Sequence, residues 1–287
     1  MERPTPYRVS TITCNGDIGT SLALRSAYEH IEIVERGTPG GGWIFVELSL
    51  SESRGLDPNV KRRNNPDRKS FVNQVTVIRD MGTPNYMPNI KLFKNGNVHM
   101  TGVRKLEDGE RIVAALADEV RRIQAGPMPD IVPEGASIVP GNFKCRMMNC
   151  DFTVPFLIRR KDLHNMLIAR PFNNISSFQP GTYPGVKIHY FWNTFTADNT
   201  ESAHDAQELR NGRCECMMHG ADNMCIGKGC GRGVGDCKKV TIAAFESGKV
   251  LITGATSVVQ VEAAYAYICN ILMMHKARLQ KVLVRPA

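Results

Sequence analysis

The stretch Phe245-Glu-Ser-Gly-Lys-Val-Leu-Ile-Thr-Gly-Ala255 decides how this sequence is interpreted, because a variant of it occurs upstream as Phe93-Lys-Asn-Gly-Asn-Val-His-Met-Thr-Gly-Val103. In both copies a phenylalanine precedes a Ser-Gly or Asn-Gly turn, and an alternating strand follows that ends on Thr-Gly. Turn pairs of this kind between alternating segments favour a β-hairpin. The chain is therefore predicted to contain two diverged copies of one unit.

A helix is predicted after each hairpin, since apolar residues recur there at helical spacing. The second helix also has a capping box, formed by Ser257 and Gln260. Strand, turn, strand and helix in each copy make this an α+β protein. The apolar positions are Ile112, Leu116, Val120 and Ile123 in the first copy and Val261, Tyr265, Ile268 and Leu272 in the second.

This order of elements resembles the TATA-box-binding protein (TBP) family, whose repeats each carry a Phe, a Ser-Gly-Lys turn and Thr-Gly-Ala before the last helix. Two further segments are similar to family motifs: Phe178-Gln-Pro-Gly-Thr-Tyr-Pro-Gly-Val186 and Ile18-Gly-Thr-Ser-Leu-Ala-Leu24. The resemblance implies a TBP-like saddle, in which two pseudosymmetric repeats form one curved antiparallel sheet with helices on its convex face.

The implied organisation is a first repeat at residues 1–124, a proline-rich linker at 125–141 and a second repeat at 142–287. A polar, basic insert is expected at about 51–70 and a cysteine-rich one at about 193–237, both after the same strand of their repeat. These inserts, together with Phe71-Val-Asn-Gln-Val-Thr-Val77 and Lys91-Leu-Phe-Lys-Asn-Gly96, resemble the TBP-like proteins of nucleocytoplasmic large DNA viruses of eukaryotes.

The composition agrees with a polyanion partner, because the formal net charge is +8 and the pI is about 9.1. Charge alone does not decide the matter, since many basic proteins bind no nucleic acid. No apolar run approaches the length of a membrane span, and the N-terminus lacks a signal-peptide core. We expect no membrane association and an intracellular location, in the host nucleus or a cytoplasmic viral factory, with packaging in the virion as a further alternative.

The resemblance implies double-stranded DNA as the ligand, held with its minor groove against the concave sheet; bending of that groove is an established property of TBP itself. An apolar floor rejects the guanine amino group of G·C pairs sterically, whereas A·T pairs present only acceptors. The candidates for this floor are Leu251 and Thr253 in the second repeat and His99 and Thr101 in the first. His99 departs from the apolar residue expected there, and as a hydrogen-bond donor it would add a pH dependence.

Wedge residues that unstack base steps are the second requirement, and the family uses two phenylalanines per repeat. The resemblance assigns Phe245 and Tyr183 in the second repeat and Phe93 in the first. The fourth is expected at Thr38 or Gly40, neither of which can act as a wedge. Asymmetric bending follows as an expectation. The alternative is that Phe93 and Phe245 are ordinary core aromatics.

A central asparagine in each repeat is the third family feature. The resemblance aligns it with Thr11 and Cys145, while Asn15 and Asn149 lie close by, so the contact stays open. Cations beside the floor are candidates for phosphate contacts, with simple solvation as the alternative reading for each. They are Lys94, Arg104, Lys105, Lys187 and Lys249.

The second insert predicts a structural Zn²⁺ site, because six soft ligands fall within a glycine-rich segment and a tetrahedral zinc needs four. The predicted ligands are Cys214, Cys216, Cys225 and Cys237, with Cys230 and His219 as alternates. Reduced thiols on a flexible loop are the competing reading. The sequence shows no group that would activate a zinc-bound water.

These expectations favour a transcription initiation factor that binds and bends A·T-rich promoter DNA and recruits a TFIIB-like factor and RNA polymerase, with no catalysis. Gly181 and Thr182 replace the acidic residues with which the family contacts TFIIB, so a diverged partner is expected. The alternatives are a protein–protein or virion scaffold with only non-specific DNA binding and, less well supported, an accessory domain of an enzyme.

Overall fold

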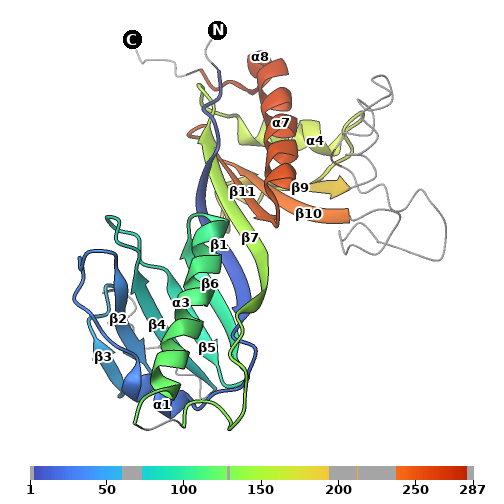
Figure 1. Ribbon diagram of the computed structural model, residues 1–287. Coiled ribbons are helices and arrows are strands. Elements are labelled where there is room, and N and C mark those ends of the chain that lie inside the picture. The colour runs from blue at the N-terminus through green and yellow to red at the C-terminus, as the bar shows by residue number, and fades with distance from the viewer. Residues whose placement is uncertain (1–2, 60–72, 128–129, 194–211, 213–236, 283–287) are drawn as a thin grey trace, which may run out of the picture. The chain divides into compact units, whose positions relative to one another are not determined.

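The computed structural model describes residues 3–59, 73–127, 130–193, 212 and 237–282. The chain divides into two compact units. The first unit is Thr11–Arg146, and the second unit combines Met1–Ser10 with Met147–Ala287. In both, antiparallel strands carry helices on one face (Figure 1), which confirms the predicted α+β class.

The first unit is a sheet in the order β3-β2-β4-β5-β6-β1. Its long helix α3 buries the predicted apolar stripe completely at Ile112, Leu116 and Val120. The elements are β1 (Arg8–Asp17), α1 (Leu24–His30), β2 (Gly42–Glu47), β3 (Ser53–Gly55), β4 (Gln74–Asp80), β5 (Asn89–Phe93), β6 (Asn97–Val103) and α3 (Leu106–Gln124).

The second unit is a sheet in the order β7-β11-β10-β9-β8. The predicted capping of its long helix α7 is confirmed: Ser257 Oγ accepts from the Gln260 N–H at 3.4 Å, and Gln260 Oε1 accepts from the Thr256 N–H at 2.8 Å. The elements are β7 (Gly141–Thr153), α4 (Arg160–Ile168), β8 (Ile175–Ser177), β9 (Val186–Asn193), β10 (Cys237–Ala244), β11 (Lys249–Ala255), α7 (Val258–Met274) and α8 (Lys276–Leu279).

The two predicted hairpins share their backbone geometry. Gly96 and Gly248 in the turns have φ of 83° and 85°, which favours glycine. The glycines of the two Thr-Gly pairs, Gly102 and Gly254, have φ of 82° and 89°, and each lies where the pairing of β6 with β1 or of β11 with β7 shifts by a residue. The repeated Thr-Gly motif therefore marks a β-bulge that needs a residue in the left-handed region.

The inserts occupy different places in the two units, so the expectation that both follow the same strand is wrong. Strand β4 pairs with β5 as β9 pairs with β10, which makes β4 and β9 equivalent. The first insert precedes β4, whereas the second follows β9. The first insert also contains the short strand β3, which pairs with β2 and was not anticipated from its polar composition.

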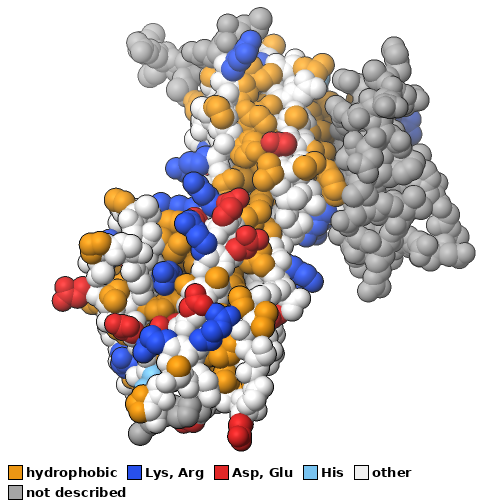
Figure 2. Space-filling view, in the orientation of Figure 1, with side chains coloured by type: hydrophobic (Ala, Val, Ile, Leu, Met, Phe, Trp, Pro, Cys, Tyr) orange, Lys and Arg blue, Asp and Glu red, His pale blue; other side chains and the backbone are white. Residues whose placement is uncertain are grey.

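The outer surfaces of the two long helices differ in chemistry. Charged side chains gather over α3, whereas hydrophobic side chains dominate the surface over α7 (Figure 2). On α7, Val259 is 53% and Met274 72% exposed. Among the described residues, no helix combines the length and apolar composition that crossing a membrane requires.

Candidate nucleic-acid interface

In each unit the sheet face opposite the helices carries the predicted floor residues, and we call it the open face. Val250 and Ile252 of β11 are fully buried on the helix side, while Leu251 between them and Thr253 after them are half-exposed. Strand β6 repeats this pattern, with Val98 and Met100 buried and the intervening His99 half-exposed; Thr101 is exposed. The alternation predicted for the two hairpins is confirmed.

The strand register allows the two open faces to be compared position by position. In the second unit, Leu251 lies opposite Asp151 on one side and Ala243 on the other. In the first unit, His99 takes the place of Leu251 and lies between Asn15 and Lys91. The centre of this row is therefore apolar in the second unit, with Asp151 beside it, and polar in the first.

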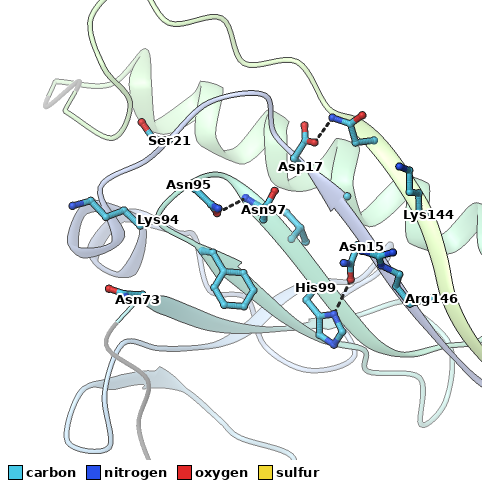
Figure 3. A pocket seen from close by; sticks show the side chains of 14 residues that line it. Asn15, Asp17, Ser21, Asn73, Lys94, Asn95, Asn97, His99, Lys144 and Arg146 are labelled. Atoms are coloured by element: carbon cyan, nitrogen blue, oxygen red, sulfur yellow. Dashed lines mark hydrogen bonds between the residues drawn. The ribbon is translucent and has the colours of Figure 1, made fainter. Parts of the chain in front are cut away.

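His99 is held by its neighbours on the open face (Figure 3). The Asn15 side-chain amide lies 2.7 Å from His99 Nδ1. With its nitrogen toward the ring, Asn15 donates to Nδ1 and to the Cys14 carbonyl, and its oxygen accepts from Arg146 Nε at 3.0 Å. Burial, followed by the charges of Lys91 and Arg146, lowers the pKa of His99 below its ordinary 6.5. The ring is consequently neutral at pH 7.

His99, Asn15 and Arg146 line a depression of about 980 Å³ on the first unit's open face. Its wall is rich in asparagine and in cations (Figure 3), and Phe93 is one of its lining residues. Such a lining is suited to hydrogen-bond acceptors and to phosphate. The lining residues that bear on function are Asn15, Asn97, His99, Lys94, Lys144 and Arg146.

The two predicted wedges of the second unit lie together at one end of its sheet. The ring centroids of Tyr183 and Phe245 are 5.7 Å apart with an interplanar angle of 59°. Gly185 lies between them, and a Cβ there would come within 2.9 Å of the Tyr183 ring and 3.1 Å of the Phe245 ring. Both rings are half-buried, so neither belongs to the fully buried core. An aromatic pair with one side open to solvent can contact a ligand.

The cations beside these residues differ in their surroundings. Lys249 and Arg8 both pair with Asp151, at 3.6 and 3.1 Å. Lys187 Nζ lies 4.2 Å from the centre of the Tyr183 ring. Of the remaining phosphate candidates, Arg104 stacks on Tyr86, and Lys105 is the N-cap of α3, so both lie where β6 enters the helix and not beside the floor.

The comparisons with known proteins agree with this geometry. Residues 236–275 match the family model of transcription factor TFIID (or TATA-binding protein, TBP). The TATA-box-binding protein-like protein of Acanthamoeba polyphaga mimivirus is 24% identical over 283 residues, which are 95% of this chain and 66% of that protein. The chain is TBP-like.

The TBP-like chain spans about two-thirds of the length of its mimivirus relative, 66%. The structure of Methanococcus jannaschii TBP aligns with a TM-score of 0.49 and 14% identity, over 94% of this chain and 99% of that one. The predicted relationship to viral TBP-like proteins is confirmed by the family match and the mimivirus relative.

The strand pairing corrects one alignment within the TBP-like chain. Tyr183 lies three positions before Val186, the first residue of β9, and the strand equivalent to β9 is β4. Thr38 and Gly40 precede β2 instead, so their alignment with Tyr183 is wrong. Leu92 and Ala244, which precede the equivalent Phe93 and Phe245, lie opposite Val75 and Val186, so by register Tyr183 corresponds to Val72, a residue outside the described ranges. The fourth wedge position is therefore a valine with Phe71 as its neighbour, and asymmetric bending stays a prediction.

The alignment of the central asparagine with Cys145 is also wrong. A hydrogen bond with Cys145, together with burial, raises the pKa of the Cys14 thiol, and Cys14 is fully buried against α3. Cys145 thus points to the helix side. Asn15 and Asn149 are the asparagines of the open faces, opposite His99 and Thr253 respectively, and the Asn149 Oδ1 has no partner within the described part of the chain. Thr11 is half-buried on β1.

The predicted zinc ligands Cys214, Cys216 and Cys225, and the alternates Cys230 and His219, lie outside the described residues. Cys237 begins β10. The described residues contain no group of three metal-ligating side chains. The zinc site therefore stays a prediction from the sequence.

Several open-face residues were missed in the sequence, namely Arg8, Lys91, Lys144, Arg146 and Asp151. The alternation of β5 could have placed Lys91 beside Phe93 on one face. The others lie on β1 and β7, where adjacent positions on the neighbouring strand are far away in the chain.

Proposed function

We propose that this TBP-like protein binds double-stranded DNA through the minor groove, with both open faces against the groove floor, and bends it at A·T-rich promoters. The observation that carries the proposal is the Tyr183 and Phe245 pair, half-exposed at the end of the second unit's open face. An aromatic pair in that place can enter a base step, at a cost of roughly a few kcal/mol for unstacking, offset by the contacts that a bent duplex permits.

The groove floor of the second unit supports A·T selectivity. Leu251 and Ala243 face the same side of neighbouring strands and carry no group that could accept the guanine amino proton. The Asp151 carboxylate beside Leu251 is paired with Arg8 and Lys249, so a guanine amino group directly over Leu251 and Ala243 would be a buried unsatisfied donor, which costs about 1–3 kcal/mol. Steric exclusion by the same side chains acts in the same direction.

The proposal includes the functional setting. The protein acts as a transcription initiation factor inside the infected cell, in the nucleus or in a viral factory, catalyses no reaction, and presents the bent DNA to a diverged TFIIB-like factor and an RNA polymerase. The family match and the mimivirus relative support this setting at the level of the family.

The test is a binding and bending experiment on one A·T-rich duplex labelled at both ends. We expect selective binding over a G·C-rich competitor, and energy transfer between the labels that rises on binding. Tyr183→Ala combined with Phe245→Ala removes both wedges of the second unit, and the transfer gain should fall by about half. Phe93→Ala tests the first unit in the same way.

Phe172→Ala is the matched control, since Phe172 packs on His275 beside α8 and not on the open face. Binding that is unselective and indifferent to all aromatic substitutions would contradict the proposal. It would favour a second candidate, a TBP-like scaffold with non-specific DNA binding, for which the polar residues His99 and Lys91 in the first unit's floor are the motivating observation.

A further inference from the structure

The two units differ at the positions that would face the bases. Leu251 pairs with Ala243 across β11 and β10, and the equivalent pair across β6 and β5 is His99 and Lys91. An apolar pair in one unit thus corresponds to two hydrogen-bonding side chains in the other.

The polar pair belongs to a built arrangement. Asn15 bridges His99 and Arg146, with bonds of 2.7 and 3.0 Å. When the Asn15 amide donates to Nδ1, the ring proton of neutral His99 resides on Nε2, which leaves an N–H donor for the open side. His99, Lys91 and Arg146 together present donors where Leu251 and Ala243 present only carbon.

Side chains that end in hydrogen-bond donors and apolar side chains interact differently with the minor groove. Both kinds of base pair carry acceptors there, and only G·C adds the guanine amino group. A carbon floor gains nothing from the acceptors and excludes the amino group. Long side chains that end in donors reach the acceptors of either pair, and Lys and Arg also hold phosphate regardless of sequence.

We propose that base selectivity is divided unequally between the units: the second unit demands A·T pairs, whereas the first unit, through His99 and Lys91, accepts G·C pairs as well. This inference rests on the proposed function. Its consequence is polarity, because a site that is A·T-rich in one half and mixed in the other is bound in a single orientation. An initiation complex assembled on that site would therefore have one orientation along the DNA.

The experiment compares three duplexes: one A·T-rich throughout, and two with G·C pairs introduced into one half or the other. For the wild-type chain we expect about a tenfold loss of affinity per pair in the strict half, the ordinary cost of a wrong base pair, and less than about threefold in the tolerant half. His99→Leu with Lys91→Ala should make the tolerant half as strict as the other. Leu251→His should instead reduce the loss of affinity caused by G·C pairs in the strict half of the site. The two variants together show which half of the DNA site each unit of the protein contacts.

Two controls separate chemistry from folding and charge. His99→Gln retains a donor and should retain tolerance, while Lys105→Ala removes the same charge as Lys91→Ala at the start of α3 and should leave all three affinities in their wild-type ratio. Equal losses in both halves of the wild-type site overturn the inference and leave the proposed function standing. Absence of any A·T preference overturns both.

Discussion

Asp151 is an acidic side chain on a surface proposed to meet phosphate, and its replacement by asparagine should strengthen DNA binding. The carboxylate is only 14% exposed and lies beside Leu251 on the open face. Arg8 Nη2 reaches both of its oxygens at 3.1 Å, and Lys249 lies at 3.6 Å. In the free protein, Asp151 therefore forms ion pairs with Arg8 and Lys249, two cations that could otherwise bind phosphate.

The size of the effect follows from counterion release. Each phosphate contact contributes a slope of about −0.9 to the logarithm of the binding constant against the logarithm of salt concentration. Two freed cations steepen the slope by about 1.8, and over a fourfold change in salt this amounts to a factor of about ten. The native fold should lose little, since exposed ion pairs are worth about 0–1 kcal/mol and Arg8 is 74% exposed.

Fluorescence anisotropy with one A·T-rich duplex at several salt concentrations measures both quantities. Asp151→Asn should bind more tightly at low salt, and its advantage should shrink about tenfold between 50 and 200 mM salt. Asp118→Asn is the matched control, because it changes the net charge equally and removes an ion pair with Arg121 on α3, away from the open face. Equal slopes for the two variants would refute the reasoning, since only total charge would then matter.

Three further predictions concern the fold and the metal. Burial is the main cause that lowers the pKa of both His99 and His189, so the unfolded chain binds protons that the native chain does not. The free energy of unfolding should therefore fall as the pH drops through about 6.5, and it should fall less in His99→Gln. Thermal melts at pH 7.5 and 5.5 measure this difference. Gly102→Ala should cost about 1–2 kcal/mol for its left-handed backbone. Gly96→Ala should cost more in urea unfolding, because its Cβ would come within 2.1 Å of the Thr20 carbonyl oxygen, and an equal cost would contradict this. The purified chain should carry zinc measurable by mass spectrometry, and Cys214→Ser should lose it while Cys269→Ser on α7 retains it; metal-free wild-type protein would remove the zinc prediction.

The hairpins and long helices could be predicted from the sequence because their signals are local. The turn glycines, the alternation around Leu251 and the cap at Ser257 each involve residues within one short segment. Partners of β1 and β7 are non-local: Asn15 and His99 are 84 residues apart, and the pattern of either strand alone gives no hint of the other.

The incorrect alignment of Thr38 and Gly40 with Tyr183 also arose because strand pairing is non-local. Thr38-Pro-Gly and Tyr183-Pro-Gly look alike and both precede a strand, but only the pairing of β9 with β10 and of β4 with β5 tells which strands are equivalent. Cys145 was misassigned because a residue's face depends on the register of its strand, and a shift of one residue exchanges the faces.

The second unit includes the first ten residues of the chain, and this affects how the protein is made. Thr5 exchanges two hydrogen bonds with Thr153, of 2.9 and 3.0 Å, and its carbonyl oxygen accepts from the Tyr265 hydroxyl at 2.9 Å. At roughly 5–20 residues per second, a ribosome adds Tyr265 some tens of seconds after Thr5. Thr5 must therefore wait for a partner that is made 260 residues later, and a protein that starts at the linker would have a second unit without these N-terminal hydrogen bonds.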